Sequence, residues 1–550
     1  MITADLLIKN GIVLTLDAQN TRAGSVAVKD GQIAGVWSQA NPPEGEVQVT
    51  VQTKVVDLKG ETLIPGFIDT HNHILGYAQI MDFVYCGTPP NKQIDDVLQA
   101  IHAKAEKTPA GEWVKGYGYD DTLLAEKRHL TRKELDKAAP DHPVFVTHVS
   151  GHLAVANSAA LELAGIDEGV SDVQQGQFGR DDDGRLNGVL YEKMAMAPVA
   201  QVLPKQSEED MVEQLGRAAQ EYLAQGITMN TDAAVGMLGK PDREMRVHME
   251  AAKQGVNPMR TQLMMMHNFL QENERFGDYT KDKLDQELRE QSDGRVRLDG
   301  AKMFQDGSIQ ALTAALREPY HNDAAVTGNL FHDQQDFNEE IIDLHKRGFR
   351  IAIHGNGDRA IGSIIEGYAH ALEAEPRAEH RHRIEHVQTA TPEDIKRMAE
   401  LDVAGSFFIN HVYYWGERHR ELFLGTERAE RISPLADAVK DNILFTLHSD
   451  CPVTPISPLF SVWAAVNRVT SEGNVLGADQ RIDVTTALKS MTIYGAALNF
   501  DEENSGSIEV GKRADFAVLD EDPTMINPSR IKDISVQATI IDGETVYQKG

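Results

Sequence analysis

Cysteine is scarce in this sequence. Its 550 residues include only Cys86 and Cys451. Two cysteines so far apart give neither a disulfide framework nor the spacing of a zinc finger. Structures that depend on either are therefore excluded, and the low count suits a reducing compartment. We expect a cytoplasmic protein.

Long hydrophobic runs and an excess of positive charge are also missing. No apolar run approaches the ~18 residues of a membrane span. Residues 1–5 lack the basic region and apolar stretch of a signal peptide. The 84 acidic and 54 basic side chains give a formal net charge of −30. Such acidity argues against nucleic acid or an anionic membrane as a partner.

Both ends of the chain are rich in short β-strand patterns. At the start, apolar segments flank Asn10-Gly11 and Asp30-Gly31, and both pairs are hairpin signals. At the other end, strand patterns fill residues 515–547. Each end is too small for a core of its own. We therefore expect residues 1–62 and 501–550 to pair into one small β-sandwich domain.

The middle of the chain alternates short apolar strands with helical stretches, which is typical of parallel βα units. Together with the strand that ends at His73, eight such strands are predicted, the number in a (β/α)8 barrel. One helix, 359–373, shows a clear apolar stripe. The predicted fold is thus an α/β, TIM-like barrel over residues 63–500. Its later strands are expected near residues 226–230, 261–266, 296–304, 349–354, 383–387, 403–409 and 443–447.

About 150 residues, roughly 75–220, interrupt the alternation after the first barrel strand. They contain their own helix patterns, at 94–107 and 157–164, and a strand pattern at 143–147. An insertion there emerges at the carboxyl ends of the strands, where barrel enzymes form their active sites. We interpret it as a lid or substrate-shaping subdomain. Its aromatic and polar residues suit a mostly apolar pocket, and the candidate substrate contacts are Trp113, Tyr117, Tyr119 and His152.

The first barrel strand carries the most informative motif. In a strand of period two, Asp69, His71 and His73 point to the same side. Two imidazoles on one face can bind a single divalent metal, with Asp69 as a supporting anchor. The alternative is a pair of histidines on an exposed strand.

Further polar residues recur at the ends of later predicted strands. These are Lys302, His354, His386 and Asp450. A barrel brings such strand ends to one mouth, so the residues predict a nitrogen and oxygen site suited to Zn²⁺. Lys302 among apolar neighbours invites a lowered pKa and, with CO₂, a carbamate between two metals. Alternatively, it is an ordinary salt-bridge partner.

These motifs resemble those of the metal-dependent amidohydrolase superfamily, and of its YtcJ-like branch, which includes N-substituted formamide deformylase. The similarity spans nearly the whole chain. The matching segments are residues 65–73, 142–158, 301–308, 354–360, 383–388, 449–453 and 506–516. There are also departures: His448 and Gln305 stand where small residues are commoner, and residues 410–415 look particular to a subgroup.

The resemblance implies a role for each of these strand-end residues. His71, His73, His354 and His386 would be metal ligands, and Asp450 would be a general base that also touches metal. Lys302, if carbamylated, would bridge two ions. His386 and Lys302 therefore join Asp450 among the catalytic candidates. Asp306, in the segment 301–308, and His411, in the subgroup segment 410–415, are added as candidate substrate contacts.

The expected reaction is hydrolysis of a non-peptide C–N bond in an amide, formamide or carbamate, with one or two divalent ions as cofactor. The expected partner is a small-molecule substrate, and the sequence leaves a homodimer open. Two alternatives remain. One is a ring deaminase, although mononuclear deaminases place a Glu shortly after the fifth-strand His, where Gly355-Asn356-Gly357 stands. The other is a non-catalytic binding protein on the same scaffold.

Overall fold

The computed structural model describes residues 1–88, 90–173 and 176–550. The chain forms two compact units. The first consists of Met1–Ala78 together with Glu208–Gly550, and the second is Gln79–Ser207.

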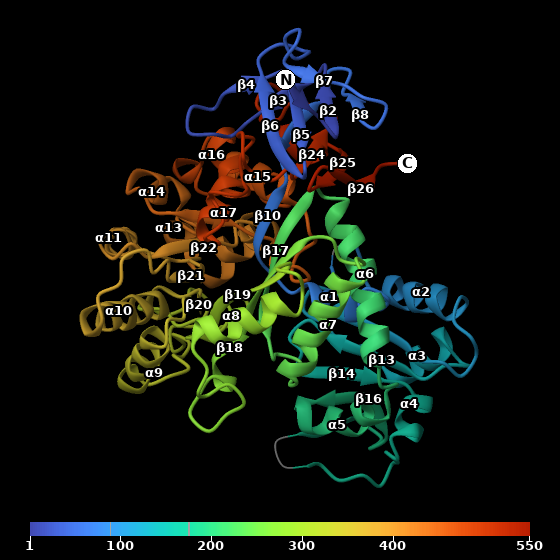
Figure 1. The fold of residues 1–550 in the computed structure, drawn as a ribbon. Coiled ribbons are helices and arrows are strands. Elements are labelled where there is room, and N and C mark those ends of the chain that lie inside the picture. Colours follow the sequence, from blue (N-terminus) through green and yellow to red (C-terminus); the bar gives the residue numbers. More distant parts are fainter. Residues whose placement is uncertain (89, 174–175) are drawn as a thin grey trace. The chain divides into compact units, whose positions relative to one another are not determined.

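The first unit is organised around a parallel sheet of eight strands that follow one another in chain order (Figure 1). Their buried, mostly apolar sequences are typical of strands covered on both faces. The predicted fold class, a TIM-like barrel with additional β and inserted parts, is confirmed. The strands are β10 Phe67–Asn72, β17 Ile227–Val235, β18 Arg260–Met266, β19 Val296–Phe304, β20 Ile351–Gly355, β21 Arg383–His386, β22 Ala404–Phe407 and β23 Phe445–Leu447.

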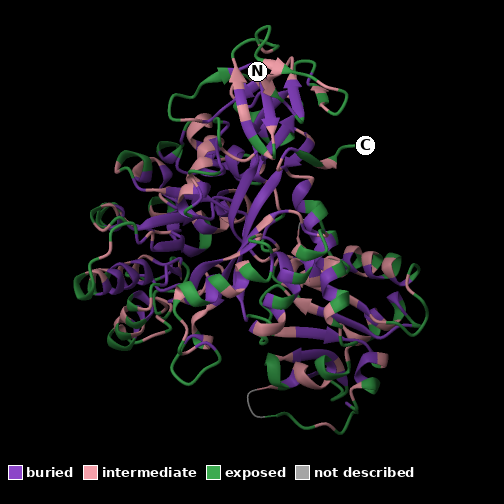
Figure 2. Ribbon diagram, viewed as in Figure 1, coloured by how far each residue is buried: buried purple, intermediate pink, exposed green. Residues whose placement is uncertain are grey.

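Amphipathic helices alternate with these strands. In α10, the predicted apolar stripe is buried at Ile361, Ile364, Ile365 and Tyr368 and half-buried at Leu372. Figure 2 shows the barrel strands almost wholly buried, whereas the helices carry exposed residues along one side. The helices are α6 Glu208–Leu223, α7 Pro241–Lys253, α8 Lys281–Glu290, α9 Gln334–Lys346, α10 Asp358–Ala374, α11 Pro392–Glu400, α12 His411–Arg418, α13 Gly425–Ala429, α14 Leu435–Lys440, α15 Pro458–Asn467, α16 Val484–Ser490 and α17 Ile493–Leu498.

The first and last strands of the barrel are joined by contacts other than a strand ladder. The Thr70 and Thr446 hydroxyl oxygens lie 2.7 Å apart. Just beyond the strand ends, the amide of Asp450 donates to the carbonyl of His71 at 3.2 Å, and that of His73 donates to Cys451 at 2.8 Å. Backbone hydrogen bonds thus hold the His-X-His motif and Asp450 together, independently of their side chains.

The two chain ends share a β-sandwich (Figure 1). One sheet has the order β6-β5-β2-β8 and the other the order β26-β25-β24-β9-β3-β4, so C-terminal strand β24 pairs with N-terminal strand β9. Their apolar faces form one core. The strands are β2 Leu6–Lys9, β3 Ile12–Leu14, β4 Arg22–Ala23, β5 Ser25–Lys29, β6 Gln32–Trp37, β8 Lys54–Asp57, β9 Thr62–Pro65, β24 Phe516–Leu519, β25 Val536–Ile541 and β26 Glu544–Gln548.

Gly66 alone separates β9 of the sandwich from β10 of the barrel. A Cβ atom at this position would lie 2.2 Å from the side chain of Thr228, so only glycine fits this close approach. The chain therefore passes from one sheet to the other in a single residue.

The hairpin predicted at Asn10-Gly11 is wrong, whereas the one at Asp30-Gly31 joins β5 to β6 as expected. Strands β2 and β3 flank Asn10-Gly11 but lie in different sheets. Strand β2 pairs with β5 and β8, and β3 pairs with β4 and β9. Long-range partners satisfy both backbones, and the step between sheets lets each strand bury its apolar side chains in the shared core.

The second unit has its own sheet, of order β11-β12-β13-β14-β16-β15, and its own apolar clusters. Asn157 accepts a hydrogen bond from Ala160 and caps the helix that follows it. The elements are β11 Val84–Tyr85, β12 Val114–Tyr119, β13 Val144–His148, β14 Leu153–Ala156, β15 Gln177–Arg180, β16 Leu186–Tyr191, α2 Ile94–Ala105, α3 Arg132–Ala138, α4 Ser158–Leu163 and α5 Glu192–Val202.

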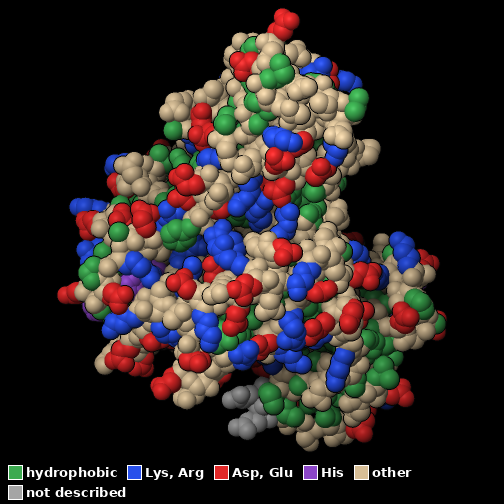
Figure 3. All heavy atoms as spheres, in the orientation of Figure 1, with side chains coloured by type: hydrophobic (Ala, Val, Ile, Leu, Met, Phe, Trp, Pro, Cys, Tyr) green, Lys and Arg blue, Asp and Glu red, His purple; other side chains and the backbone are tan. Residues whose placement is uncertain are grey.

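Acidic and basic side chains are interspersed on the face of the molecule shown in Figure 3. The net negative charge is therefore not gathered into a single patch on that face. Within the part of the chain that the structure describes, no helix combines the length and apolar character needed to cross a membrane.

Candidate metal centre

Four imidazoles converge where the barrel strands end. The ring centroid of His71 lies 5.5 Å from that of His73 and 5.0 Å from that of His386. The His386 ring in turn lies 4.4 Å from that of His354. Strands β10, β20 and β21 position these side chains, as the sequence predicted for parallel strands that end at one mouth.

Asp450 completes the cluster from the end of β23. Its Oδ1 atom lies 3.3 Å from His71 Nε2 and 3.2 Å from His73 Nε2. Burial by itself would raise the pKa of Asp450, but hydrogen bonds with His71 and His73 outweigh it and hold that pKa well below the usual range. The carboxylate is therefore ionised at neutral pH.

Two of these residues have unusual backbone conformations. His386 has a φ of 72° and Asp450 a φ of 53°. Residues other than glycine rarely adopt this left-handed region, and it is concentrated at functional sites.

Each of three histidines is fixed through one ring nitrogen, which leaves the other for a ligand. The Nδ1 atom of His71 lies 2.6 Å from Glu385 Oε2. The Nε2 atom of His354 lies 2.9 Å from the carbonyl oxygen of Gly307. The Nδ1 atom of His386 lies 3.2 Å from His448 Nε2. Outer partners of this kind set the tautomer and the direction of a ligating imidazole.

Lys302 reaches the cluster from β19. Its side chain is buried, and its Nζ has no hydrogen-bond partner in the described part of the chain. Burial lowers the pKa of Lys302 to about 8, although Glu385 and Asp450 oppose this shift. A neutral amine is therefore accessible near physiological pH.

Four buried charged side chains, which were not predicted from the sequence, form a network that contacts His71 through Glu385. Arg383 contacts both Glu385 and Asp299, and Asp299 also pairs with Arg350. All four side chains are at most 4% exposed. Charged residues alternating with apolar ones in the strand Arg383-Ile384-Glu385 were the available signal, because a barrel strand places every second side chain in the interior.

Asp69 acts as the anchor that the motif suggested. It accepts hydrogen bonds from the His71 amide, at 3.1 Å, and from the Ser449 hydroxyl, at 2.8 Å. Burial raises the pKa of Asp69 to about 6, even though these bonds favour its ionised form. The carboxyl thereby ties the His-X-His strand to the segment that carries Asp450.

Of the predicted substrate contacts, Asp306 and His411 lie in the barrel unit. Asp306 is buried and accepts hydrogen bonds from the amides of Ala315, Asn356 and Gly357, which suits a loop-organising role. His411 is buried beside Phe408, with ring centroids 4.2 Å apart. Its Nδ1 atom has no hydrogen-bond partner among the described residues.

The other predicted contacts belong to the second unit. Trp113 packs against that unit's apolar cluster. Tyr119 is buried, with its hydroxyl 3.3 Å from His129 Nδ1. His152 is exposed and pairs with Glu192 at 3.0 Å. Contact of these residues with substrate remains a prediction.

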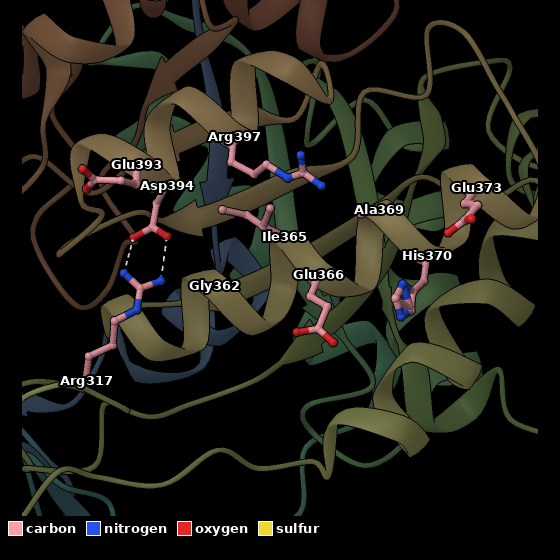
Figure 4. Close-up of a pocket in the computed structure, with 10 residues that line it drawn as sticks. All are labelled: Arg317, Gly362, Ile365, Glu366, Ala369, His370, Glu373, Glu393, Asp394 and Arg397. Atoms are coloured by element: carbon pink, nitrogen blue, oxygen red, sulfur yellow. Dashed lines mark hydrogen bonds and ion pairs between the residues drawn. The ribbon is translucent and has the colours of Figure 1, made fainter.

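A groove on the surface of the barrel unit lies between α10 and α11 (Figure 4). One ion pair lies at this groove: Arg317 donates to both oxygens of Asp394. No residue of the predicted metal site is among those that line it. The groove therefore gives no support for a second catalytic centre.

The residues at the barrel mouth fit a divalent metal. Among the described residues, His71, His73 and Asp450 form one of two groups whose ligand atoms lie within 4.8 Å of one another. The other group is Asp120, Asp121 and His148, in the second unit. At the mouth, Lys302 Nζ is buried without a hydrogen-bond partner among the described residues, and the buried Asp450 Oδ1 faces the Nε2 atoms of His71 and His73 at 3.3 and 3.2 Å. Imidazole nitrogens and a carboxylate oxygen gathered in this way are the ligands that a Zn²⁺ site uses.

Comparison with known proteins gives full-length matches. A sequence model described as "Amidohydrolase family" matches residues 54–547. The chain is 30% identical to N-substituted formamide deformylase of Arthrobacter pascens, covering 99% of this chain and 98% of the relative. It is 28% identical to a Bacillus subtilis protein designated YtcJ, covering 98% of both. The crystal structure of an uncharacterised metal-dependent hydrolase from Pyrococcus horikoshii has a TM-score of 0.74 at 23% identity, covering 95% of this chain and 99% of that one.

Proposed function

Because this chain belongs to the amidohydrolase family, a family of hydrolases that act on carbon–nitrogen bonds, we propose that it cleaves a non-peptide C–N bond with the help of bound Zn²⁺. The proposed substrates are amides, formamides or carbamates of small molecules. Similarity over the full length to a formamide deformylase supports formamides as the first class to test.

One observation carries this proposal. Side chains from four strands, β10, β20, β21 and the end of β23, meet at the barrel mouth and present imidazole nitrogens around the ionised Asp450. Each histidine with a fixed nitrogen has the other nitrogen left for binding. Imidazole nitrogens gathered around one carboxylate are well suited to a divalent cation.

His71, His73, His354, His386 and Asp450 are the proposed ligands. Zn²⁺ held by such residues lowers the pKa of water from ~15.7 to about 7 and polarises a carbonyl group. Burial lowers the pKa of His354 to about 3, and that of His386 also lies well below its usual value. Both imidazoles are therefore neutral at pH 7 and do not repel a cation.

Asp450 is the proposed general base. Its lowered pKa keeps it ionised, so it can accept a proton from the attacking water and later donate that proton to the leaving nitrogen. His411, with its unpartnered Nδ1, is a proposed hydrogen-bonding partner for the substrate. Its pKa falls to about 3 on burial, which keeps the ring neutral.

Lys302 is proposed to react with CO₂ and to serve as a carbamate between two metal ions. The nucleophile in that reaction is the neutral amine, which a pKa of about 8 makes available. Attack of the amine on CO₂ would form an N–C bond and release one proton, and the negative charge of the carbamate would lie on its two oxygens, beyond Nζ. ¹³C NMR of protein loaded with labelled bicarbonate would detect it, and an unmodified amine in the metal-loaded protein would leave Lys302 as a neighbouring charge only.

A ring deaminase is the less favoured alternative. In place of a Glu after the fifth-strand histidine stands Asn356, whose amide donates to the carbonyl of Gly307 at 2.9 Å. An amide cannot shuttle protons as a carboxylate does. The same carbonyl lies beside His354 Nε2, so Asn356 is part of the support for that histidine.

The proposal can be tested with purified, Zn²⁺-loaded protein on a panel of N-formyl amines, N-acyl amines, carbamates and aminopurines. We expect turnover of a member of the first three classes and none of the aminopurines. Asp450→Asn keeps shape and hydrogen bonding but removes the base, so turnover should fall by a factor on the order of 10² or more. Deamination alone, or an Asp450→Asn variant as active as wild type, would contradict the proposal.

A further inference from the structure

His448 contacts two of the proposed metal ligands, His386 by a hydrogen bond and His71 by stacking. It directly follows β23 and is fully buried. Its Nε2 atom lies 3.2 Å from His386 Nδ1, and its Nδ1 atom lies 2.8 Å from the hydroxyl of Ser406. The side chains therefore form a linear chain from Ser406 through His448 to His386.

Packing fixes the orientation of the His448 ring. The ring stacks on His71, with centroids 4.6 Å apart and planes at 22°. It also stacks on Phe408, at 5.4 Å and 20°. The two stacking partners hold the plane of the ring, and the hydrogen bonds to Ser406 and His386 determine where its two nitrogens lie in that plane.

The hydrogen bonds then determine where the protons lie. A neutral imidazole has one donor and one acceptor. If His386 presents Nε2 to a metal, its Nδ1 carries the proton and donates to His448 Nε2. His448 must then carry its own proton on Nδ1 and donate it to the Ser406 hydroxyl oxygen. All three groups are satisfied while both imidazoles stay neutral.

The support of His386 differs in kind from that of the other two ligands. His71 is held by the carboxylate of Glu385 and His354 by the carbonyl of Gly307. His386 alone of these three is held by a neutral imidazole. A neutral imidazole draws the proton of His386 away less strongly than the Glu385 carboxylate draws that of His71. His386 therefore keeps the character of an ordinary imidazole ligand.

We propose that His448 is a positioning residue, which fixes the tautomer and direction of His386 and thereby strengthens metal binding, and that Ser406 fixes the tautomer of His448. This inference rests on the proposed function, since it requires His386 to bind metal. It assigns a purpose to the position at which the sequence departs from the small residue commoner in the family.

A matched control exists in the same barrel. His345 Nδ1 lies 2.8 Å from His382 Nε2, a second buried imidazole pair. His382 immediately precedes β21, at the end opposite to His386. Substituting His345 therefore removes the same type of hydrogen bond from the segment that leads into this strand, without touching the proposed ligands.

The experiment is a Zn²⁺ competition titration against a chelating dye for wild type, His448→Leu, His448→Gln, Ser406→Ala and His345→Leu. Loss of an outer partner typically weakens metal affinity ~10–100-fold. We expect this loss in His448→Leu, substantial recovery in His448→Gln, whose amide oxygen can accept from His386, and a smaller loss in Ser406→Ala. His345→Leu should bind Zn²⁺ as wild type does, even where its thermal stability falls.

Equal affinity of His448→Leu and wild type would overturn the inference, as would an equal loss in His448→Leu and His345→Leu. If His448→Leu fails to fold, His448→Gln and Ser406→Ala still test the inference. Two results together would then overturn it: Ser406→Ala binds Zn²⁺ as tightly as wild type does, and His448→Gln binds it as weakly as a His386→Ala variant does. Failure of the proposed function would look different, because wild type itself would then bind no Zn²⁺ at these histidines.

Discussion

Lys302 is the single residue whose charge responds most directly to its surroundings. Its amine is buried without a hydrogen-bond partner, and its pKa falls from 10.5 to about 8. The folded protein therefore holds this proton less tightly than the unfolded chain does. The contribution of Lys302 to the free energy of unfolding is fully present only above about pH 10.5, and it is lost as the pH falls through 8.

A pH series on metal-free protein tests this. Between pH 7 and 9.5, wild type should gain stability relative to Lys302→Met, by up to about 3 kcal/mol if the whole range to pH 10.5 were accessible. Other groups titrate in both proteins and cancel in the difference. The free energy of unfolding by urea gives the comparison. Parallel pH profiles for the two proteins would mean that Lys302 is not desolvated as described.

At the scale of elements, the contact between β10 and the segment after β23 determines whether His71 and His73 lie close to Asp450. The Ser449 hydroxyl donates to the buried Asp69 carboxyl at 2.8 Å. The pKa of Asp69 is raised to about 6 by burial, so the carboxyl is ionised above that pH and protonated below it. A hydrogen bond to an ionised group is worth more than one to a neutral group.

Ser449→Ala should therefore destabilise the protein by about 1–3 kcal/mol at pH 8 and by less at pH 5. Urea unfolding at both pH values measures this. Thr454→Ala removes a neighbouring hydroxyl that donates to a carbonyl, at 2.6 Å, and its cost should not depend on pH in this range. The same cost for Ser449→Ala at both pH values would contradict the assignment of the Asp69 charge.

The elements also show what sequence patterns can and cannot predict. Apolar periodicity and the polar residues at strand ends predicted the eight barrel strands, and the structure brings His71, His73, His354, His386 and Asp450 together. Glu385, Ser406 and the role of His448 were not predicted, because they depend on which ring nitrogen faces which neighbour. The Asn10-Gly11 hairpin failed for a related reason: a local turn signal does not reveal the long-range partners of its two strands.

At the scale of the whole molecule, the two compact units have separate cores. The proposed ligands all lie in the unit formed by Met1–Ala78 and Glu208–Gly550. The inserted unit, Gln79–Ser207, has its own apolar cluster, which includes the fully buried Leu135. Loss of packing in the inserted unit should therefore leave metal binding intact.

Leu135→Ala should cost about 2–5 kcal/mol in the inserted unit, as large-to-small core substitutions do. The metal content should equal that of wild type. Leu447→Ala, a matched substitution in β23 at an equally buried position, should lower metal content because it loosens the strand that leads to Asp450. Differential scanning calorimetry and metal analysis of both variants check this. Metal loss in Leu135→Ala equal to that in Leu447→Ala would show that the units do not behave separately.

The account depends most on the claim that the strand-end histidines hold a divalent metal. The direct measurement is the metal content, by mass spectrometry, of purified wild type and of the His71→Ala/His73→Ala double variant, with His345→Ala as a control for loss of a buried histidine. We predict one to two Zn²⁺ or similar divalent ions per chain in wild type and in the control, and loss of metal from the double variant. Full metal occupancy in the double variant would contradict the account.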